Sequence, residues 1–365
     1  MSRVVTRWLP AVLVPVLIAG GTLAAHAVTD VPLPIKTPGQ VLALAASDSI
    51  NAFSGTLQQS SDLGLPELPT TGPAAGAAGS MGASSADAAA ASALELLTGS
   101  HTARVYADGS TKERVQVMDT LAERDLVRNG TDLWLYDSSK AAATHVTLPS
   151  ASVTLSDGAA SSPTRLVPTP SQLAQKLLTN LTPSTAVSLG ANTSVAGHDA
   201  YDLVLTPRTS DTLIGSVSIA VDAQHGFPLS VAVTARGAQT PAFSVAFSQL
   251  SYQAPSADLF SFSPPAGATV KQQALPTKAR LQAGAPSEGA TATPVVTGTD
   301  WTTVVQLAGS IPVNLLDLPL LSQLTISVAG GRVVSTALLN VLLTTDGRVF
   351  IGSVPVAALQ AAAAG

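Results

Sequence analysis

Apolar and polar residues alternate along several short segments between residues 101 and 252, and this pattern constrains the fold more than any other feature. Every second residue is apolar at 217–221, 229–233 and 243–247. Successive side chains of a strand point to opposite faces, so the pattern predicts half-buried strands. The dipeptides Asp108-Gly109 and Asn129-Gly130 separate earlier strand-like segments and are typical of hairpin turns. We therefore predict a large antiparallel sheet with one apolar face.

Helical periodicity is confined to short stretches. Leucines recur at helical spacing up to residue 181, after Thr169-Pro170-Ser171, a sequence typical of a helix start. A second short helix is predicted at 40–47 and a third at 87–97, whereas 333–343 fits a helix and a strand equally well. The apolar face of the sheet must be covered, and these few helices are the available cover.

Composition shifts divide the chain into six parts. Residues 65–85 are dominated by small residues and proline, which bury too little surface to offset the cost of ordering. A second stretch rich in Pro, Ala, Gly and Thr begins near residue 274. The predicted organisation is an N-terminal signal or anchor (1–27), a linker (28–37), a main domain (38–273) with a flexible insert (63–85), a linker (274–298) and a small β-rich extension (299–365).

The N-terminus has the three parts of a secretory signal. Arg3 and Arg7 precede an uncharged apolar stretch, and Ala25-His26-Ala27 offers a cleavage site. The stretch is also just long enough to span a bilayer as a retained anchor. Both alternatives remain open, and both place the rest of the chain outside the cytoplasm, secreted or held at the outer face of the cytoplasmic membrane.

Charge and cysteine content exclude several classes of function. Only 11% of residues are charged and the net charge is −5, so the chain lacks the basic surface that nucleic acids need. With no cysteine, the chain has no disulfide, thiolate metal site or cysteine nucleophile. We predict no cofactor and no metal.

Catalytic signatures are equally sparse. None of the five histidines lies within four residues of another, and the sequence lacks Gly-x-Ser-x-Gly, Gly-x-Gly-x-x-Gly and P-loop motifs. A dispersed serine site is the third hypothesis, behind two non-enzymatic ones. Charged residues at 112–114 and 123–128 fit a solvated outer face better than a docking face, and Trp134 and Tyr136 share one strand face and fit core packing.

The order of several motifs resembles a known family. A helix and strand at 40–59 come first, followed by Asn-Gly-Thr-Asp-Leu-Trp-Leu-Tyr-Asp at 129–137, a strand-turn-strand at 222–233 and Leu-Phe-Ser-Phe-Ser-Pro-Pro from residue 259. This succession resembles the LolA-like lipoprotein-carrier superfamily, including the MucB/RseB-like regulators of envelope-stress sigma factors. The tail at 339–354 resembles an extension found in actinobacterial versions.

The resemblance implies a mainly β (α+β) fold: a curved, unclosed antiparallel half-barrel with a helical lid over an apolar cavity for acyl chains. Each buried CH₂ of such a chain contributes about 0.8 kcal/mol. The cavity-lining candidates are Leu173, Leu177, Val217, Ile219, Val231, Val233, Phe243 and Phe247.

Two functions follow from this resemblance. The first is a non-enzymatic extracytoplasmic protein that shelters the acyl chains of a lipid or lipoprotein. The alternative is an envelope-stress sensor that binds a membrane-anchored protein. The carrier proper has an arginine on an early strand, and many extracytoplasmic relatives have a lipobox cysteine, but segment 50–58 has no arginine and the chain has no cysteine. Binding or sensing therefore fits better than transport to an outer membrane.

Overall fold

The computed structural model describes residues 31–64, 99–118, 123–148, 169–179, 181–274, 295–307 and 325–365. All structural statements below concern these residues. The predicted signal or anchor at 1–27, the predicted helix at 87–97 and nearly all of the predicted insert at 63–85 lie outside them.

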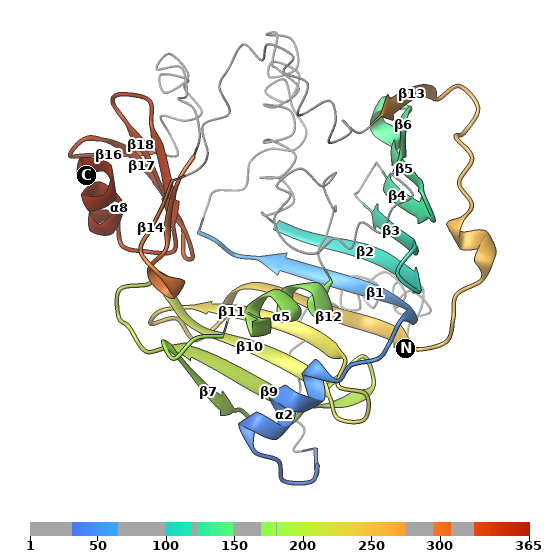
Figure 1. The fold of residues 1–365 in the computed structure, drawn as a ribbon, viewed down its shortest axis with the longest axis horizontal. Helices are drawn as coiled ribbons and strands as arrows, with labels where there is room; N and C mark the ends of the chain where they lie inside the picture. The colour runs from blue at the N-terminus through green and yellow to red at the C-terminus, as the bar shows by residue number, and fades with distance from the viewer. Residues whose placement is uncertain are drawn as a thin grey trace, which may run out of the picture.

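One large sheet contains thirteen strands in the order β13-β6-β5-β4-β3-β2-β1-β12-β11-β10-β9-β7, with β8 paired to β9. The end strands β13 and β7 do not pair with each other, so the sheet is open (Figure 1). The strands are β1 (Ala52–Ser61), β2 (Gly99–Asp108), β3 (Lys112–Met118), β4 (Glu123–Asn129), β5 (Asp132–Asp137), β6 (Ala142–Thr147), β7 (Thr185–Leu189), β8 (Thr193–Val195), β9 (His198–Pro207), β10 (Ile214–Asp222), β11 (Pro228–Ala235), β12 (Pro241–Ser251) and β13 (Thr269–Ala274).

The predicted large antiparallel sheet is confirmed, with one exception at its edge. Strand β13 runs parallel to β6, pairing Thr269 with Ala142. The Asp108-Gly109 and Asn129-Gly130 turns fall where predicted, with Gly109 and Gly130 at φ of 70° and 63°. The left-handed region suits glycine because it has no Cβ, so these turn residues set the β2–β3 and β4–β5 hairpins.

A second sheet lies in the C-terminal part of the chain. Its six strands have the order β14-β15-β19-β18-β17-β16. They are β14 (Val295–Thr297), β15 (Val304–Gln306), β16 (Ile326–Val328), β17 (Gly331–Ser335), β18 (Asn340–Thr344) and β19 (Val349–Gly352). Segment 333–343 is therefore strand rather than helix, because a turn from Thr336 to Leu339 interrupts it. The alanine-rich helix α8 (Val356–Ala364), which the sequence did not predict, packs on β18 and β19.

Helices α2 (Pro38–Ala46) and α5 (Pro170–Thr179) lie on the same side of strands β9–β12 (Figure 1). Helix α2 begins at a capping box, in which the Thr37 side chain and backbone exchange hydrogen bonds with Gln40. It contacts β7 and β9, whereas α5 contacts β11 and β12. The predicted helix after Thr169-Pro170 is confirmed as far as Thr179.

The two faces of the large sheet have different covers. We call the face that carries Leu57, Val231 and Phe247 the inner face; α5 and α2 pack on it, and all three side chains belong to the main apolar core. On the opposite, outer face, the short turn η3 (Ala257–Phe260) lies against β3 and β4. Two further short turns are η2 (Ser138–Lys140) and η4 (Asp300–Thr302).

Candidate functional site

The inner face of strands β9–β12 carries continuous rows of apolar side chains. Val217 pairs with Leu205 of β9 on one side and with Val233 on the other, and Val233 pairs with Phe243. The next row runs from Ile219 to Val231. Cross-strand neighbours on one face lie close enough to touch, so the pairing joins four strands into one apolar surface.

Six of the eight predicted lining residues lie together on this surface. Val217, Ile219, Val231 and Phe247 are at most 2% exposed. Val233 and Phe243 are partly buried against the same core. The structure therefore brings the strand candidates together, and they pack against other side chains of the protein's own core.

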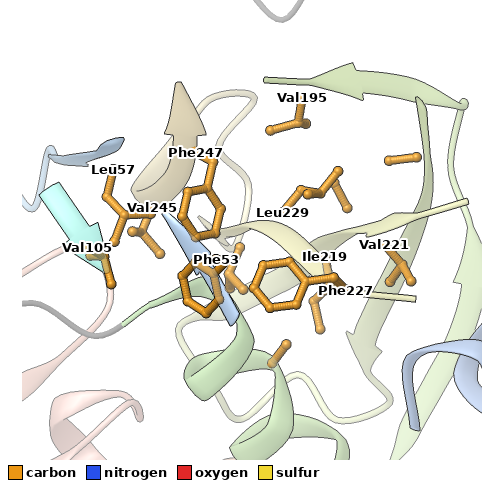
Figure 2. Packing of buried hydrophobic residues seen from close by; sticks show 14 of the residues in the cluster. Phe53, Leu57, Val105, Val195, Ile219, Val221, Phe227, Leu229, Val245 and Phe247 are labelled. Atoms are coloured by element: carbon orange, nitrogen blue, oxygen red, sulfur yellow. The ribbon is translucent and has the colours of Figure 1, made fainter. Parts of the chain in front are cut away.

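An aromatic group sits at the β1 end of the surface. Phe53 and Phe227 have ring centroids 5.1 Å apart, and Phe247 lies 5.9 Å from each (Figure 2). Phe53 and Phe227 were not among the predicted residues. Phe53 lies four residues before Leu57 and therefore on the same face of β1, which could have indicated it, but Phe227 follows a turn and no pattern marks it.

Helix α5 covers these rows in an uneven way. Thr169 caps the helix, because its hydroxyl accepts from the N–H of Gln172 and its own N–H donates to the Gln172 side chain. Ala174 is fully buried, whereas the larger Leu173 and Leu177, both predicted lining residues, are only partly buried against the core. The smallest of these side chains is the most completely buried, so α5 buries less apolar area against the sheet than its leucines could.

A polar cluster fixes the end of β10. Asp222 is 1% exposed and accepts hydrogen bonds from the Tyr252 hydroxyl at 2.6 Å and from the N–H groups of Gln224 and His225 at 2.8 Å. The Nδ1 atoms of His225 and His198 lie 3.3 and 3.5 Å from its carboxylate oxygens. His225 lies in the turn that follows β10.

The pKa values in this cluster follow from burial and hydrogen bonding. Burial raises the pKa of Asp222, but the hydrogen bonds from Tyr252 and the two turn N–H groups outweigh it and hold the pKa below its usual value. Burial, together with the hydrogen bond to Asp222, raises the pKa of Tyr252. Nearby Asp48 also has a pKa raised by burial, with a smaller contribution from the charge of Asp222. The cluster therefore keeps Asp222 ionised and Tyr252 protonated.

The outer face of β3–β5 is partly buried rather than fully solvated. Arg114 pairs with Asp125 at 2.6 Å and donates to the carbonyl oxygen of Leu259 in η3. Burial raises the pKa of Asp125, which the hydrogen bond and charge of Arg114 lower only in part. Trp134 and Tyr136 share this face as predicted, and their rings pack against Phe262.

Catalytic or membrane-spanning features do not emerge from the described ranges. No group of three or more His, Asp or Glu side chains there could hold a metal ion. None of the helices in those ranges is both long and apolar enough to cross a membrane.

Comparisons with known proteins give structural likeness alone. No family model and no curated protein matches the sequence. The fold resembles MucB at 18% identity and a TM-score of 0.39, covering 88% of this chain and 94% of MucB. A chain of the Pseudomonas aeruginosa MucA/MucB complex gives 16% identity and a TM-score of 0.40, covering 89% of this chain and 96% of that one. A LolA superfamily protein from Nitrosomonas europaea gives 13% identity and a TM-score of 0.22, covering 62% and 99%.

The solved structures that this chain resembles thus include the MucB and LolA-superfamily proteins that its motifs resemble. The actinobacterial type stays a prediction. Because every quoted TM-score is below 0.5, the function proposed next rests on the geometry of the inner face.

Proposed function

We propose that this chain is an extracytoplasmic, non-enzymatic protein that shelters the acyl chain of a lipid or lipoprotein against the inner face of β9–β12. In the structure α5 packs on β11 and β12, and on this proposal an acyl chain takes the place of α5. The lining residues are the eight predicted ones, with Phe53 and Phe227 added.

The observation that carries this proposal is that the leucines of α5 are incompletely buried on a broad apolar surface. The strand residues beneath it, such as Ile219 and Val231, are almost completely buried, yet Leu173 and Leu177 of the helix remain partly exposed. Segments with few buried apolar contacts open at low free-energy cost. Displacement of α5 would expose the rows of strand side chains to an alkyl chain, whose burial would offset the lost helix contacts.

Helix α5 is tested with a charge placed at a half-buried position. We expect Leu177→Asp to weaken binding of a fluorescent long-chain fatty acid at least tenfold, because a carboxylate would enter an apolar contact. The matched control is Gln175→Asp, which adds the same charge at an exposed position of the same helix. Fluorescence titration measures both; wild-type affinity in the first variant would contradict the lid assignment.

The strand face is tested with an isosteric pair that leaves the fold intact. Val233→Thr places a hydroxyl on the inner face, whereas Thr234→Val removes one from the neighbouring outer position. We expect the first change to weaken fatty-acid binding and the second to leave it unchanged. Equal effects would place the acyl chain elsewhere. Native mass spectrometry of the gently purified protein tests for bound lipid directly, and capture of a single-span membrane protein without lipid would favour the sensor hypothesis.

A further inference from the structure

A polar cleft lies on the outer face of the large sheet and is lined by residues of β1, β2 and β12. Figure 1 shows β1 between these two neighbouring strands. Its volume is about 280 Å³. Successive side chains of these strands point to opposite faces. The side chains around the cleft therefore alternate along each strand with the side chains that point into the apolar core. The six outward side chains are Ser54, Thr56, Arg104, Tyr106, Gln249 and Ser251. This cleft is separated by the sheet itself from the proposed acyl-binding face.

The cleft arises from a β-bulge between β1 and β12. Thr56 pairs with Gln249 but the next residue, Leu57, pairs with Phe247, which leaves Ser248 unpaired in register. The Ser248 hydroxyl donates to the carbonyl oxygen of Thr56 at 3.2 Å. A bulge bends its strand and redirects side chains. At the floor, Gly55 permits close strand approach, because a Cβ there would lie 2.7 Å from the Gln249 carbonyl oxygen.

Arg104 brings an unneutralised positive charge to this cleft. Among the described residues its exposed guanidinium has no hydrogen bond, ion pair or ring contact. Acidic groups on the same outer face have other partners: Asp125 pairs with Arg114, and Glu123 accepts from the Gln116 amide at 2.9 Å. Asp108 pairs with Lys112 at 3.0 Å. The guanidinium is therefore available to a ligand.

The lining chemistry narrows the class of ligand. A guanidinium surrounded by hydroxyl groups can meet a tetrahedral oxyanion from several sides, and Arg forms paired hydrogen bonds to phosphate. The cleft has room for roughly nine water molecules at about 30 Å³ each, which exceeds a bare phosphate. The amide of Gln249 and the hydroxyls of Ser54 and Ser251 suit further hydroxyl groups. We propose that this cleft binds a phosphorylated polyol, with Arg104 on the phosphate.

Two sources carry this chemistry, a free polyol phosphate and the headgroup of an anionic phospholipid. The probes are myo-inositol 1-phosphate, titrated by NMR, and phosphatidylcholine vesicles with and without phosphatidylinositol. We expect the wild-type protein to bind at least one of them. Binding to the soluble phosphate identifies a free ligand, and binding only to the phosphatidylinositol vesicles identifies a membrane headgroup.

Two variants separate the cleft from overall charge. We expect Arg104→Gln to weaken binding about ten- to a hundredfold, as the loss of a charge-assisted hydrogen bond predicts. The matched control, Lys271→Gln, removes another exposed cation on β13, which does not border the cleft, and we expect it to change affinity less than about twofold. Ser54→Leu, which fills the cleft without changing charge, should also abolish binding.

Several results would overturn the proposal. The wild-type protein could fail to bind either probe at millimolar concentration. The Arg104 and Lys271 variants could lose equal affinity, or Ser54→Leu could keep full affinity. Fatty-acid titration of the same variants keeps this test separate from the proposed function. We expect Arg104→Gln to keep wild-type fatty-acid affinity, because Arg104 faces away from the inner surface.

Discussion

The two halves of the large sheet are covered on opposite faces by different kinds of contact. On β11 and β12 the cover is α5, held by apolar side chains of which the leucines remain partly exposed. On β3 and β4 it is η3, held by the buried Phe260, by the Arg114–Asp125 pair and by a hydrogen bond to Leu259. Apolar contacts tolerate sliding, whereas directional hydrogen bonds do not. Under the proposed function we therefore expect α5 to be displaced more easily than η3.

The largest expected effect comes from breaking the fixed cover. Asp125→Ala should lower the free energy of unfolding by about 3 kcal/mol, because it leaves the Arg114 side chain, only 19% exposed, without its charge partner. Denaturant unfolding measures it. The control is Lys140→Ala, whose ammonium is 71% exposed beside Asp137 and should matter by less than about 1 kcal/mol. If both variants lost similar free energy of unfolding, the Arg114–Asp125 pair would hold η3 no more firmly than an exposed ion pair does.

The second prediction concerns Asp222, the last residue of β10 in the half of the sheet that α5 covers. Asp222→Asn keeps the shape but loses the charge, and should cost about 1 to 3 kcal/mol near neutral pH. Because the folded-state pKa is below the unfolded value, the ionised Asp222 stabilises the protein above about pH 4, and this contribution disappears as the pH falls through the folded pKa. Unfolding of both proteins across this range should show the difference shrinking. A constant difference would rule out a charge effect.

The third prediction asks whether α2 is as loosely held as α5. Gly226 has a φ of 73°, and a Cβ there would collide with the carbonyl oxygen of Leu44 near the end of α2. Gly226→Ala should therefore cost about 1 to 2 kcal/mol from backbone strain alone, and more if α2 cannot shift. As a control, Gly39→Ala adds a Cβ that meets nothing within 4 Å. A thermal shift equal to that of the control would mean that α2 yields easily.

The smallest effect is expected at the contact between the two sheets. The Trp301 indole N–H donates to the hydroxyl of Thr185 at 2.8 Å, and Trp301 packs against the main core. Trp301→Phe keeps an aromatic ring but removes the donor, so we expect a loss of about 1 kcal/mol. Calorimetry should show one transition for both proteins if this contact is only one of several. Separate transitions in the variant would make Trp301 the main link.

Local patterns in the sequence predicted much of this fold. Alternation gave the strands of β10–β12, and the Asp-Gly and Asn-Gly turns set two hairpins, because both depend on neighbouring residues. Segment 333–343 stayed ambiguous because its composition fits a helix and a strand equally well. The turn that begins at Thr336 and separates two strands does not show in that composition. The parallel pairing of β13 with β6 was missed, since the strands lie far apart in the chain.

The inner face and the outer cleft also differ in how far the sequence could predict them. The strand residues of the inner face were predictable because Val217, Ile219 and their neighbours repeat every second position. The outer cleft was not, because it depends on a bulge between Thr56 and Gln249, 193 residues apart. The buried Arg114–Asp125 pair was interpreted from sequence as solvated, because nothing local shows that η3 would cross it.

The pairing of β1 with β12 also affects the order in which the strands of the large sheet can pair during folding. Strands β2–β6 and β9–β12 each form mostly from sequence neighbours, but β1 meets β12 only after nearly the whole sheet has been synthesised. Contacts of such long sequence separation slow folding. Since Arg104 and Gln249 approach one another only across this seam, the outer cleft forms only once β12 has paired with β1, whereas β9–β12 can pair among themselves before that.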